Sequence, residues 1–201
     1  MLCKIDRRKP LKTTRNIKCI AISIAVLSAL VLTSCSTKYA VYSNEMYAGK
    51  KLFQEKEYEK AKGYLVQASQ DQRNSASLAL LGTIYYKTGD LANAESAIRE
   101  AEGIDKDSGY LLRILGYKSL ILLKKDKPEG FKALRQYADC VKNLNIPFEM
   151  HDVETMIAKN TVDFDILDAK IEEQATWYEN EMEKWNEGNP GYFSDKYGRP
   201  M

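Results

Sequence analysis

The histidine and the carboxylates of the C-terminal third come nearest, in residue type and spacing, to a reactive site. His151, the only histidine of the chain, lies beside Glu149, Asp152 and Glu154. Imidazole and carboxylate groups bind Zn²⁺, and a zinc-bound water hydrolyses substrates. No second nitrogen or thiolate ligand is spaced to join this group, and acidic residues favour the first turn of a helix for electrostatic reasons. We expect no enzyme and no metal site; a hydrolase or metal-binding protein using His151 is the alternative.

Three aspartates further along the chain have a spacing that suggests calcium ligands. They are Asp163, Asp165 and Asp168, but the glycine and the final glutamate of a calcium loop are absent. The aspartates therefore predict the N-terminus of a helix. The glutamates that follow predict a solvated acidic face; they are Glu172, Glu173, Glu179, Glu181 and Glu183. The sequence also lacks a glycine-rich phosphate loop and a nucleophile elbow, so it contains no recognisable set of catalytic residues.

The first 35 residues have the pattern of an export signal. Seven basic residues precede a mostly apolar run from Ile20 to Leu32, and small residues follow. The apolar run is shorter than the ~20 residues that span a bilayer. Leu32-Thr33-Ser34-Cys35 resembles the lipobox of bacterial lipoproteins. That resemblance implies that residues 1–34 are removed and that Cys35 gains a diacylglycerol and an N-terminal acyl chain. We expect no cofactor besides this covalent lipid.

The lipid on Cys35 would place the protein in the bacterial cell envelope. The alternative is an uncleaved helical anchor, and in both cases residues 36–201 are held at a membrane outside the cytoplasm. Two or three acyl chains hold a protein far more firmly than one, because each buried CH₂ contributes ~0.8 kcal/mol. Ser36 is compatible with sorting to the outer membrane of a two-membrane bacterium. We therefore predict a protein anchored in the outer membrane that faces the periplasm.

The charge of the mature chain differs from that of the full sequence. The full chain has 30 basic and 28 acidic residues, of which residues 1–34 hold seven basic and one acidic. The mature chain therefore has 23 basic and 27 acidic residues, a formal charge of −4. This balance argues against nucleic-acid binding, which requires a basic face. Cys140 is the one cysteine left besides Cys35, so the mature fold must be held by its core without an internal disulfide.

A repeat of 33 residues is the main organising feature of the mature chain. Five small or apolar residues recur at this offset: Gly49, Leu52, Ala61, Leu65 and Ala68 correspond to Gly82, Tyr85, Ala94, Ile98 and Ala101. Small residues in these places let two antiparallel helices approach, and the large ones fill the seam between them. The period and pattern resemble the tetratricopeptide repeat (TPR), which is a helix–turn–helix unit of 34 residues.

A third, degenerate unit follows the first two. Leu112, Leu115 and Gly116 match the first helix of the pattern, and Pro128 is predicted to open the second helix. Gly130, Leu134 and Tyr137 then replace the small–large–small pattern after a two-residue insertion. Because Tyr137 is large, we expect looser or shifted packing there.

The fold class predicted from these patterns is all-α, a TPR-like α-solenoid of about three helix-turn-helix repeats with a C-terminal helical extension. A solenoid needs a terminal cap, and the long last helix is the candidate. Helices are expected near 42–55, 58–72, 75–88, 91–104, 109–124, 128–143, 149–159 and 163–187. The predicted segments are a signal peptide at 1–34, a lipidated linker at 35–41, repeats at 42–145 (42–74, 75–108 and 109–145), a helical cap at 146–188 and a tail at 189–201.

The first helices of TPR units line a concave groove, and the resemblance implies that this groove binds a partner. The implied groove residues are Met46, Lys50, Phe53, Ala79, Thr83, Tyr86, Lys87, Tyr110, Arg113, Tyr117 and Leu120. Their rings offer contact area, and their cations could bind an acidic or C-terminal carboxylate group. The alternative is that the C-terminal helix fills the groove itself.

The function expected from this plan is that of an adaptor or assembly factor at the envelope. Its partner would be another envelope protein or peptide, and the lipid would provide its contact with the membrane. Envelope TPR lipoproteins resemble the chain in plan, and they assemble pili, secretins, outer-membrane proteins or cell-wall enzymes. A structural subunit whose repeats self-associate is a further alternative.

Overall fold

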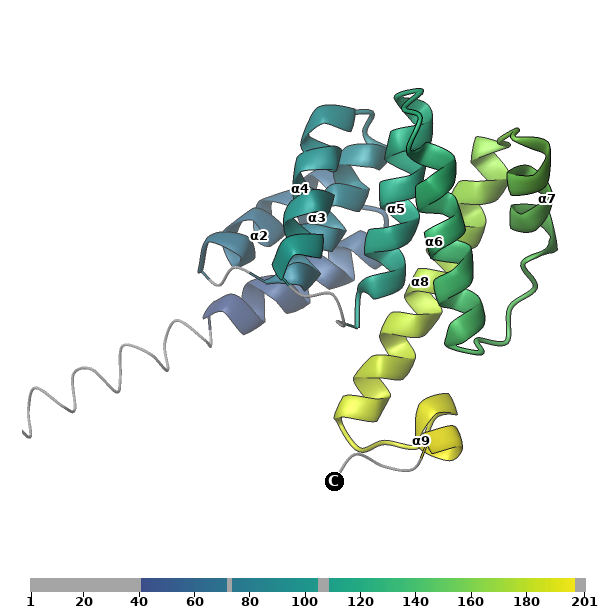
Figure 1. The fold of residues 1–201 in the computed structure, drawn as a ribbon. Helices are drawn as coiled ribbons and strands as arrows, with labels where there is room; N and C mark the ends of the chain where they lie inside the picture. Colours follow the sequence, from purple (N-terminus) through teal and green to yellow (C-terminus); the bar gives the residue numbers. More distant parts are fainter. Residues whose placement is uncertain (1–40, 72–73, 105–108, 198–201) are drawn as a thin grey trace, which may run out of the picture. The chain divides into compact units, whose positions relative to one another are not determined.

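The computed structural model describes residues 41–71, 74–104 and 109–197, and residues 42–201 form one compact unit. The predicted signal peptide, Cys35 and almost all of the linker lie outside the described residues. The described part is helical throughout and contains no strand (Figure 1). Its helices pack in neighbouring antiparallel pairs, so the predicted fold class is confirmed.

The observed helix bounds differ from the predicted ones by at most two residues. The chain is helical over 41–54, and the later helices are α2 (Tyr58–Asp71), α3 (Ser75–Lys87), α4 (Leu91–Ile104), α5 (Leu111–Lys124), α6 (Gly130–Asn143), α7 (His151–Lys159), α8 (Phe164–Asn186) and α9 (Tyr192–Tyr197). Three hairpins result: helix 41–54 with α2, α3 with α4, and α5 with α6. The last helix, α9, falls in the segment that was predicted to be a tail.

The 33-residue recurrence corresponds to one contact that is made twice. A Cβ atom on Gly49 would lie 2.7 Å from Cγ of Leu65, and one on Gly82 would lie 2.6 Å from Cγ1 and Cδ1 of Ile98. In both hairpins the first helix therefore presents a backbone notch into which the large side chain of the second helix fits. The alanines of the pattern are fully buried in the same seams; they are Ala61, Ala68, Ala94 and Ala101.

The third hairpin departs from this contact. The notch at Gly116 receives Ile171 of α8, with the ring of Tyr137 also in contact. Tyr137 is fully buried, and its hydroxyl donates a hydrogen bond to Gln174 of α8. The large residue predicted to shift the packing therefore connects the hairpin to α8.

The prediction that Pro128 opens the second helix of the third unit is wrong. Pro128 lies in a turn that is closed by a hydrogen bond from the Gly130 N–H to the Lys127 carbonyl, and the helix begins at Gly130. Gly130 is needed there because a Cβ atom would lie 2.8 Å from Cδ2 of Leu123.

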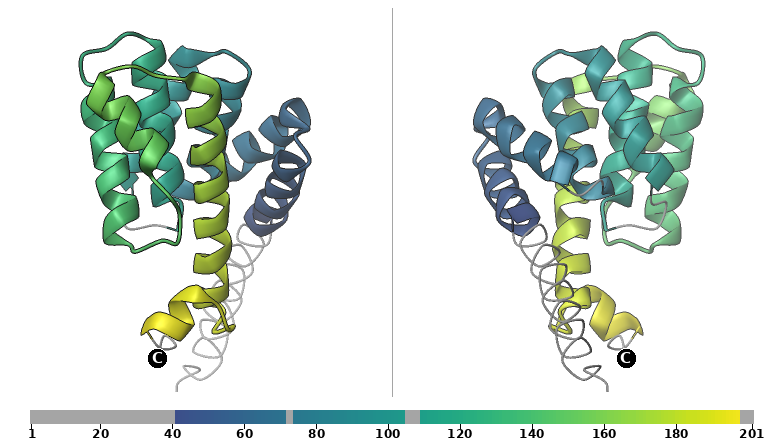
Figure 2. Two further views of the ribbon diagram at one scale, coloured as in Figure 1. Left: turned by 90° about the vertical axis from the view of Figure 1, so that its right-hand side faces the viewer. Right: turned by 90° about the vertical axis from the view of Figure 1, so that its left-hand side faces the viewer.

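Helix α8 belongs to the core of the unit. Leu167, Ile171 and Ala175 of α8 are fully buried and share one apolar cluster with Leu112 and Tyr117 of α5. The end of the third hairpin is instead flanked by α7, which packs against α6. Figure 2 shows α8 running between the first hairpin and the third in both views.

The C-terminal helix α9 is docked on α8. Its Phe193 is buried, with the ring 5.8 Å from that of Tyr178. The Tyr192 N–H donates a hydrogen bond to Oε2 of Glu181 at 2.6 Å, and the Tyr192 ring lies 5.3 Å from that of Trp177. Each helix of the described residues is too short or too polar to cross a membrane.

Candidate functional site

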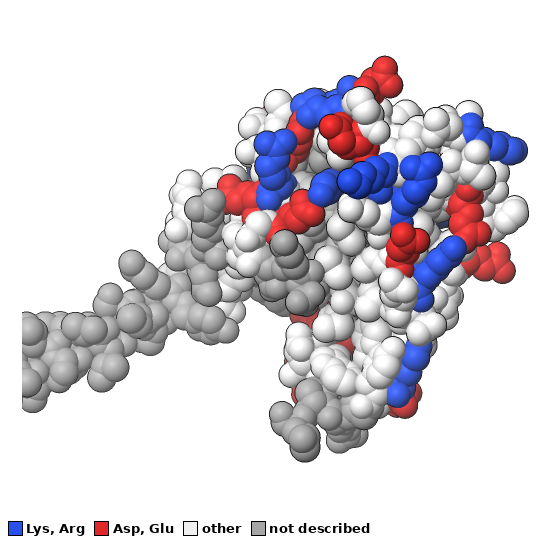
Figure 3. All heavy atoms as spheres, in the orientation of Figure 1, with Lys and Arg blue, Asp and Glu red and all other residues white. Residues whose placement is uncertain are grey.

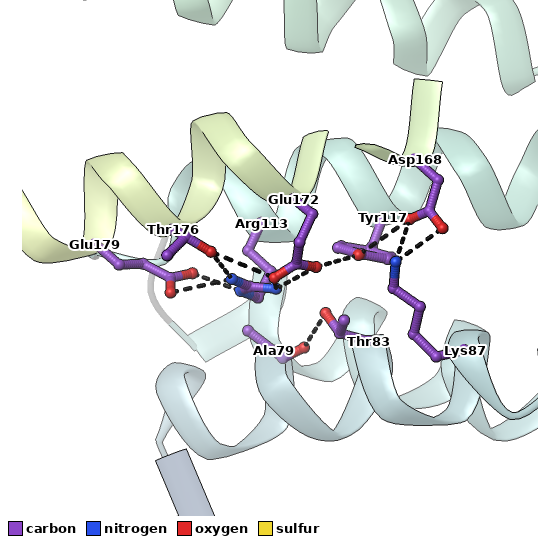
Figure 4. Close-up of polar contacts among 9 residues, drawn as sticks. All are labelled: Ala79, Thr83, Lys87, Arg113, Tyr117, Asp168, Glu172, Thr176 and Glu179. Atoms are coloured by element: carbon purple, nitrogen blue, oxygen red, sulfur yellow. Dashed lines mark hydrogen bonds and ion pairs between the residues drawn. The ribbon is translucent and has the colours of Figure 1, made fainter. Parts of the chain in front are cut away.

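The three cations of the predicted groove all bind carboxylates of α8. Lys50 pairs with Glu183. Lys87 pairs with Asp168, and Arg113 pairs with Glu172 and Glu179 (Figure 4). The cations come from helix 41–54, α3 and α5, which are the first helices of the three hairpins. Along α8 the four carboxylates are separated by four, seven and four residues, which places them on one face of a helix.

Arg113 is the centre of this contact. Its side chain is fully buried, and its guanidinium donates to both oxygens of Glu179, with Nε to Oε1 at 2.5 Å and Nη2 to Oε2 at 3.2 Å. Its Nη1 donates to both oxygens of Glu172 at 3.0 and 3.1 Å, and its Nη2 reaches Oγ1 of Thr176 at 3.3 Å. Such forked pairing uses the planar geometry of the guanidinium fully, so Arg113 has no donor left for an external carboxylate.

Tyr117 extends the network toward the end of α3. Its hydroxyl donates to Glu172 and lies 3.2 Å from Oδ1 of Asp168, and Lys87 Nζ is 2.8 Å from both oxygens of Asp168. Burial and the nearby carboxylate of Glu172 raise the pKa of Tyr117 well above its ordinary value, so its hydroxyl stays protonated and acts as a donor. One continuous polar network thus joins Lys87 to Arg113.

Three of the four aromatic residues predicted for the groove are buried: Phe53, Tyr86 and Tyr117. The Arg113 guanidinium stacks 4.9 Å from the centre of the buried Phe53 ring, and the rings of Tyr86 and Tyr117 meet edge to face at 5.4 Å. The Tyr86 hydroxyl is buried without a hydrogen-bond partner among the described residues, and burial raises its pKa. Burial also raises the pKa of Tyr110, which is half-buried.

The small and apolar residues of the predicted groove lie in the interior. Ala79, Thr83 and Leu120 are fully buried, and the Thr83 hydroxyl donates to the Ala79 carbonyl at 3.1 Å. Met46 is half-buried against an apolar cluster that the first and second hairpins share. Of the two alternatives left open by the sequence, the one in which the C-terminal helix fills the groove is present in the structure.

The prediction of a solvated acidic face on α8 is wrong for three of its five glutamates. The side chains of Glu172, Glu179 and Glu181 are 29%, 5% and 8% exposed. Burial alone would raise the pKa of Glu172, but Arg113 and Tyr117 hold it below its ordinary value. Glu181 accepts a hydrogen bond from the Tyr192 N–H and forms an ion pair with Lys184, and these two contacts compensate for its burial. The other two glutamates of the set are exposed.

His151 is exposed at the start of α7, and two of the three acids near it pair with lysines. Asp152 lies 3.0 Å from Nζ of Lys170, and Glu154 lies 2.5 Å from Nζ of Lys142. Across the described ranges, no group of three or more histidine, cysteine or acidic residues could hold a metal ion. Asp163 caps α8 as predicted, because its carboxylate accepts the N–H groups of the second and third residues after it at 3.1 Å.

The burial of the groove leaves an open cleft beside α8, which the sequence did not predict. The cleft has a volume of about 690 Å³ and is bounded on one side by α8 from Asp165 to Asn180. Lys56 in the turn before α2, Tyr58 at the start of α2 and Lys87 at the end of α3 form the opposite side. We call it the α8 cleft.

The outer face of the unit carries mixed charge. In Figure 3, lysine and arginine side chains alternate with aspartate and glutamate across this face. Glu95 of α4 pairs with three cations, with Lys125 Nζ at 2.5 Å, Lys127 Nζ at 2.6 Å and Arg99 Nη2 at 2.8 Å. Hydrogen bonds from Lys125 and Lys127 lower the pKa of Glu95 from 4.5 to about 2. These pairs connect α4 to the turn between α5 and α6.

We expect Glu95 to contribute a pH-dependent part of the stability. Since its pKa is lower in the folded chain than in the unfolded one, the contribution is complete above pH 4.5 and is lost as the pH falls toward 2. Glu95→Gln should therefore lower the free energy of unfolding by about 1 kcal/mol above pH 5 and by almost nothing near pH 2. Urea denaturation of both proteins over this range measures the difference. A constant difference across the range, or an equal effect of the exposed-site control Glu149→Gln, would contradict this role.

Comparison of the chain with models of known protein families, with curated proteins and with solved structures finds no match.

Proposed function

We propose that this chain is a lipid-anchored envelope protein that binds another protein through its TPR-like hairpins, as an adaptor or assembly factor. The observation that supports this proposal most directly is the repeated notch, in which Gly49 receives Leu65 and Gly82 receives Ile98. A stack of hairpins built on one repeated contact presents extended surfaces that suit protein binding. The lipobox-like Leu32–Cys35 supports the anchor and the location outside the cytoplasm.

The contacts of α8 change where such a partner would bind. The cations predicted to receive an acidic partner are already bound to carboxylates, and α8 is held by the shared core through Ile171 and its neighbours. The surfaces left for a partner are the α8 cleft and the outer faces of the helices. The proposal therefore concerns the hairpin unit with α8 in place.

Photo-crosslinking in cells tests the proposed function. A crosslinking amino acid is placed at exposed positions on different elements: Ala92 of α4, Gln136 of α6, Ala158 of α7 and Asn180 of α8. We expect at least one position to give a single dominant adduct with another envelope protein. The same adduct should be lost or strongly reduced in Cys35→Ala, which removes the lipidation site.

Two outcomes would contradict this function. Adducts that contain only a second copy of the chain would favour the self-associating structural subunit. An absence of protein adducts at all four positions, with the protein present at normal levels, would reject the adaptor function.

A further inference from the structure

The α8 cleft differs in its chemistry from the groove that the sequence predicted. That groove was expected to bind an acidic group of a partner through Lys50, Lys87 and Arg113. In the structure, carboxylates of α8 bind these three cations. An external acidic helix would have to displace α8 and expose a core that contains Leu167 and Ile171. The buried apolar area of α8 makes this exchange unfavourable, so a partner meets the cleft with α8 as one of its walls.

The dimensions of the cleft fit an extended peptide segment. Its α8 wall runs from Asp165 to Asn180, which is about 22 Å at a rise of 1.5 Å per residue. An extended chain covers about 3.3 Å per residue, so the wall is as long as about seven residues. Half-buried Tyr58 and Trp177 line the two sides of the cleft. Trp177 is held in place by Phe148, whose ring meets it edge to face at 5.5 Å.

The charge that remains in the cleft is negative. Its walls carry four carboxylates and two lysines. Lys87 forms an ion pair with Asp168, and Glu172 forms one with Arg113. Asp165 and Glu173 are exposed and have no ion pair among the described residues, while Lys56 is the only other cation of the walls. Burial is the main cause that raises the pKa of Tyr58, and the carboxylates of Glu172 and Asp168 raise it further.

The two exposed carboxylates also define a spacing for the ligand. Asp165 and Glu173 are eight residues apart on α8, which is about 12 Å along the helix. In an extended peptide, side chains four residues apart are separated by about 13 Å. They also point to the same side, because side chains alternate along a strand.

We propose that the α8 cleft binds a basic, extended segment of a partner protein, with two lysine or arginine side chains four residues apart on Asp165 and Glu173. The aromatic faces of Tyr58 and Trp177 would contact the same side chains by cation–π interaction. This inference rests on the proposed function and deepens it, because it names the kind of partner segment. A second copy of the chain is a poorer occupant, since the mature chain carries a formal charge of −4.

Fluorescence polarisation with labelled eight-residue peptides tests the cleft on the full-length chain in detergent. One peptide has lysines four residues apart in a background of serine, glycine and tyrosine. A second has the two lysines adjacent, and a third has glutamates in place of the lysines. We expect the first to bind at least tenfold more tightly than the third and several-fold more tightly than the second. Raising the salt concentration should weaken this binding.

Two matched double variants identify the binding surface. Asp165→Asn with Glu173→Gln removes both exposed carboxylates of the cleft and should weaken binding of the first peptide about tenfold. Asp139→Asn with Glu149→Gln makes the same chemical change at exposed positions outside the cleft and should leave the affinity unchanged. Equal affinities for the two double variants, or tighter binding of the glutamate peptide, would overturn the inference. A dimer of the chain that is lost only in the cleft variant would also overturn it, in favour of a second copy.

Crosslinking separates failure of the cleft from failure of the proposed function. Crosslinkers at Ala169 and Asn180, both exposed in the cleft, should capture a partner segment with an excess of lysine and arginine. Capture of an envelope protein only from Ala92 or Ala158 would reject the cleft and leave the adaptor function in place. Capture of a neutral or acidic segment at the cleft positions would also reject the inference.

Discussion

Replacing Arg113 by methionine is expected to lower the free energy of unfolding by about 3–5 kcal/mol, because it leaves the buried carboxylate of Glu179 and the half-buried carboxylate of Glu172 without their partner. Glu179 is 5% exposed and Glu172 is 29% exposed, and Arg113 donates to both oxygens of each. Chemical denaturation of the full-length chain, followed by the helical signal in circular dichroism, measures the loss. Arg135→Met provides the control, because Arg135 is exposed on α6; we expect it to change stability by less than about 0.5 kcal/mol.

The triple variant Arg113→Met, Glu172→Gln, Glu179→Gln distinguishes unpaired charge from lost packing. Removing the two carboxylates together with the guanidinium leaves no unpaired charge, so most of the stability should return. If the single variant loses less than about 1 kcal/mol, or if the triple variant is no more stable than the single one, the network does not hold α8 as described.

Replacing Gly82 by alanine is expected to destabilise the chain by about 1–3 kcal/mol, although alanine forms helices better than glycine. The added methyl group would lie 2.6 Å from Cγ1 and Cδ1 of Ile98 and 3.4 Å from its backbone nitrogen. Gly63 lies in the neighbouring helix α2, and a Cβ atom there meets nothing within 4 Å. Gly63→Ala should therefore raise the free energy of unfolding by up to about 1 kcal/mol.

The two substitutions are chemically identical, so their opposite signs isolate the contact between the helices. Adding Ile98→Val to Gly82→Ala removes Cδ1 and should restore part of the lost stability, as measured by thermal or urea unfolding. Equal effects of the two glycine substitutions would show that the notch does not determine how the hairpin packs.

The hairpins could be predicted from the sequence because their contacts are local and repeated. Gly82 and Ile98 are 16 residues apart, and the same pair of positions occurs at Gly49 and Leu65. A recurrence of small and large residues therefore reports directly on the seam between two helices. Pro128 shows the limit of this reasoning, because a proline that suits the first turn of a helix also suits the turn before it.

The position of α8 required information that local patterns do not carry. The spacing of Asp168, Glu172, Glu179 and Glu183 places them on one helix face, opposite three groove cations, so the signal was present in the sequence. The same spacing is also typical of a solvated helix. Only the structure shows that Arg113 is buried between α5 and α8, where it pairs with Glu179. The α8 cleft is formed by segments more than 100 residues apart in sequence, such as Lys56 and Glu173, and no sequence pattern marks it.

The contacts of α8 also determine how the unit should unfold. In a simple solenoid each repeat touches only its neighbours, and separate repeats can open one at a time. Here one helix is bonded to the first hairpin at Lys50, the second at Lys87 and the third at Arg113. The three hairpins are therefore connected through α8, and the Lys50–Glu183 pair joins residues 133 positions apart in the sequence. We therefore expect the three hairpins to open in one cooperative transition, so that the buried amides of all three exchange hydrogen with similar free energies of opening.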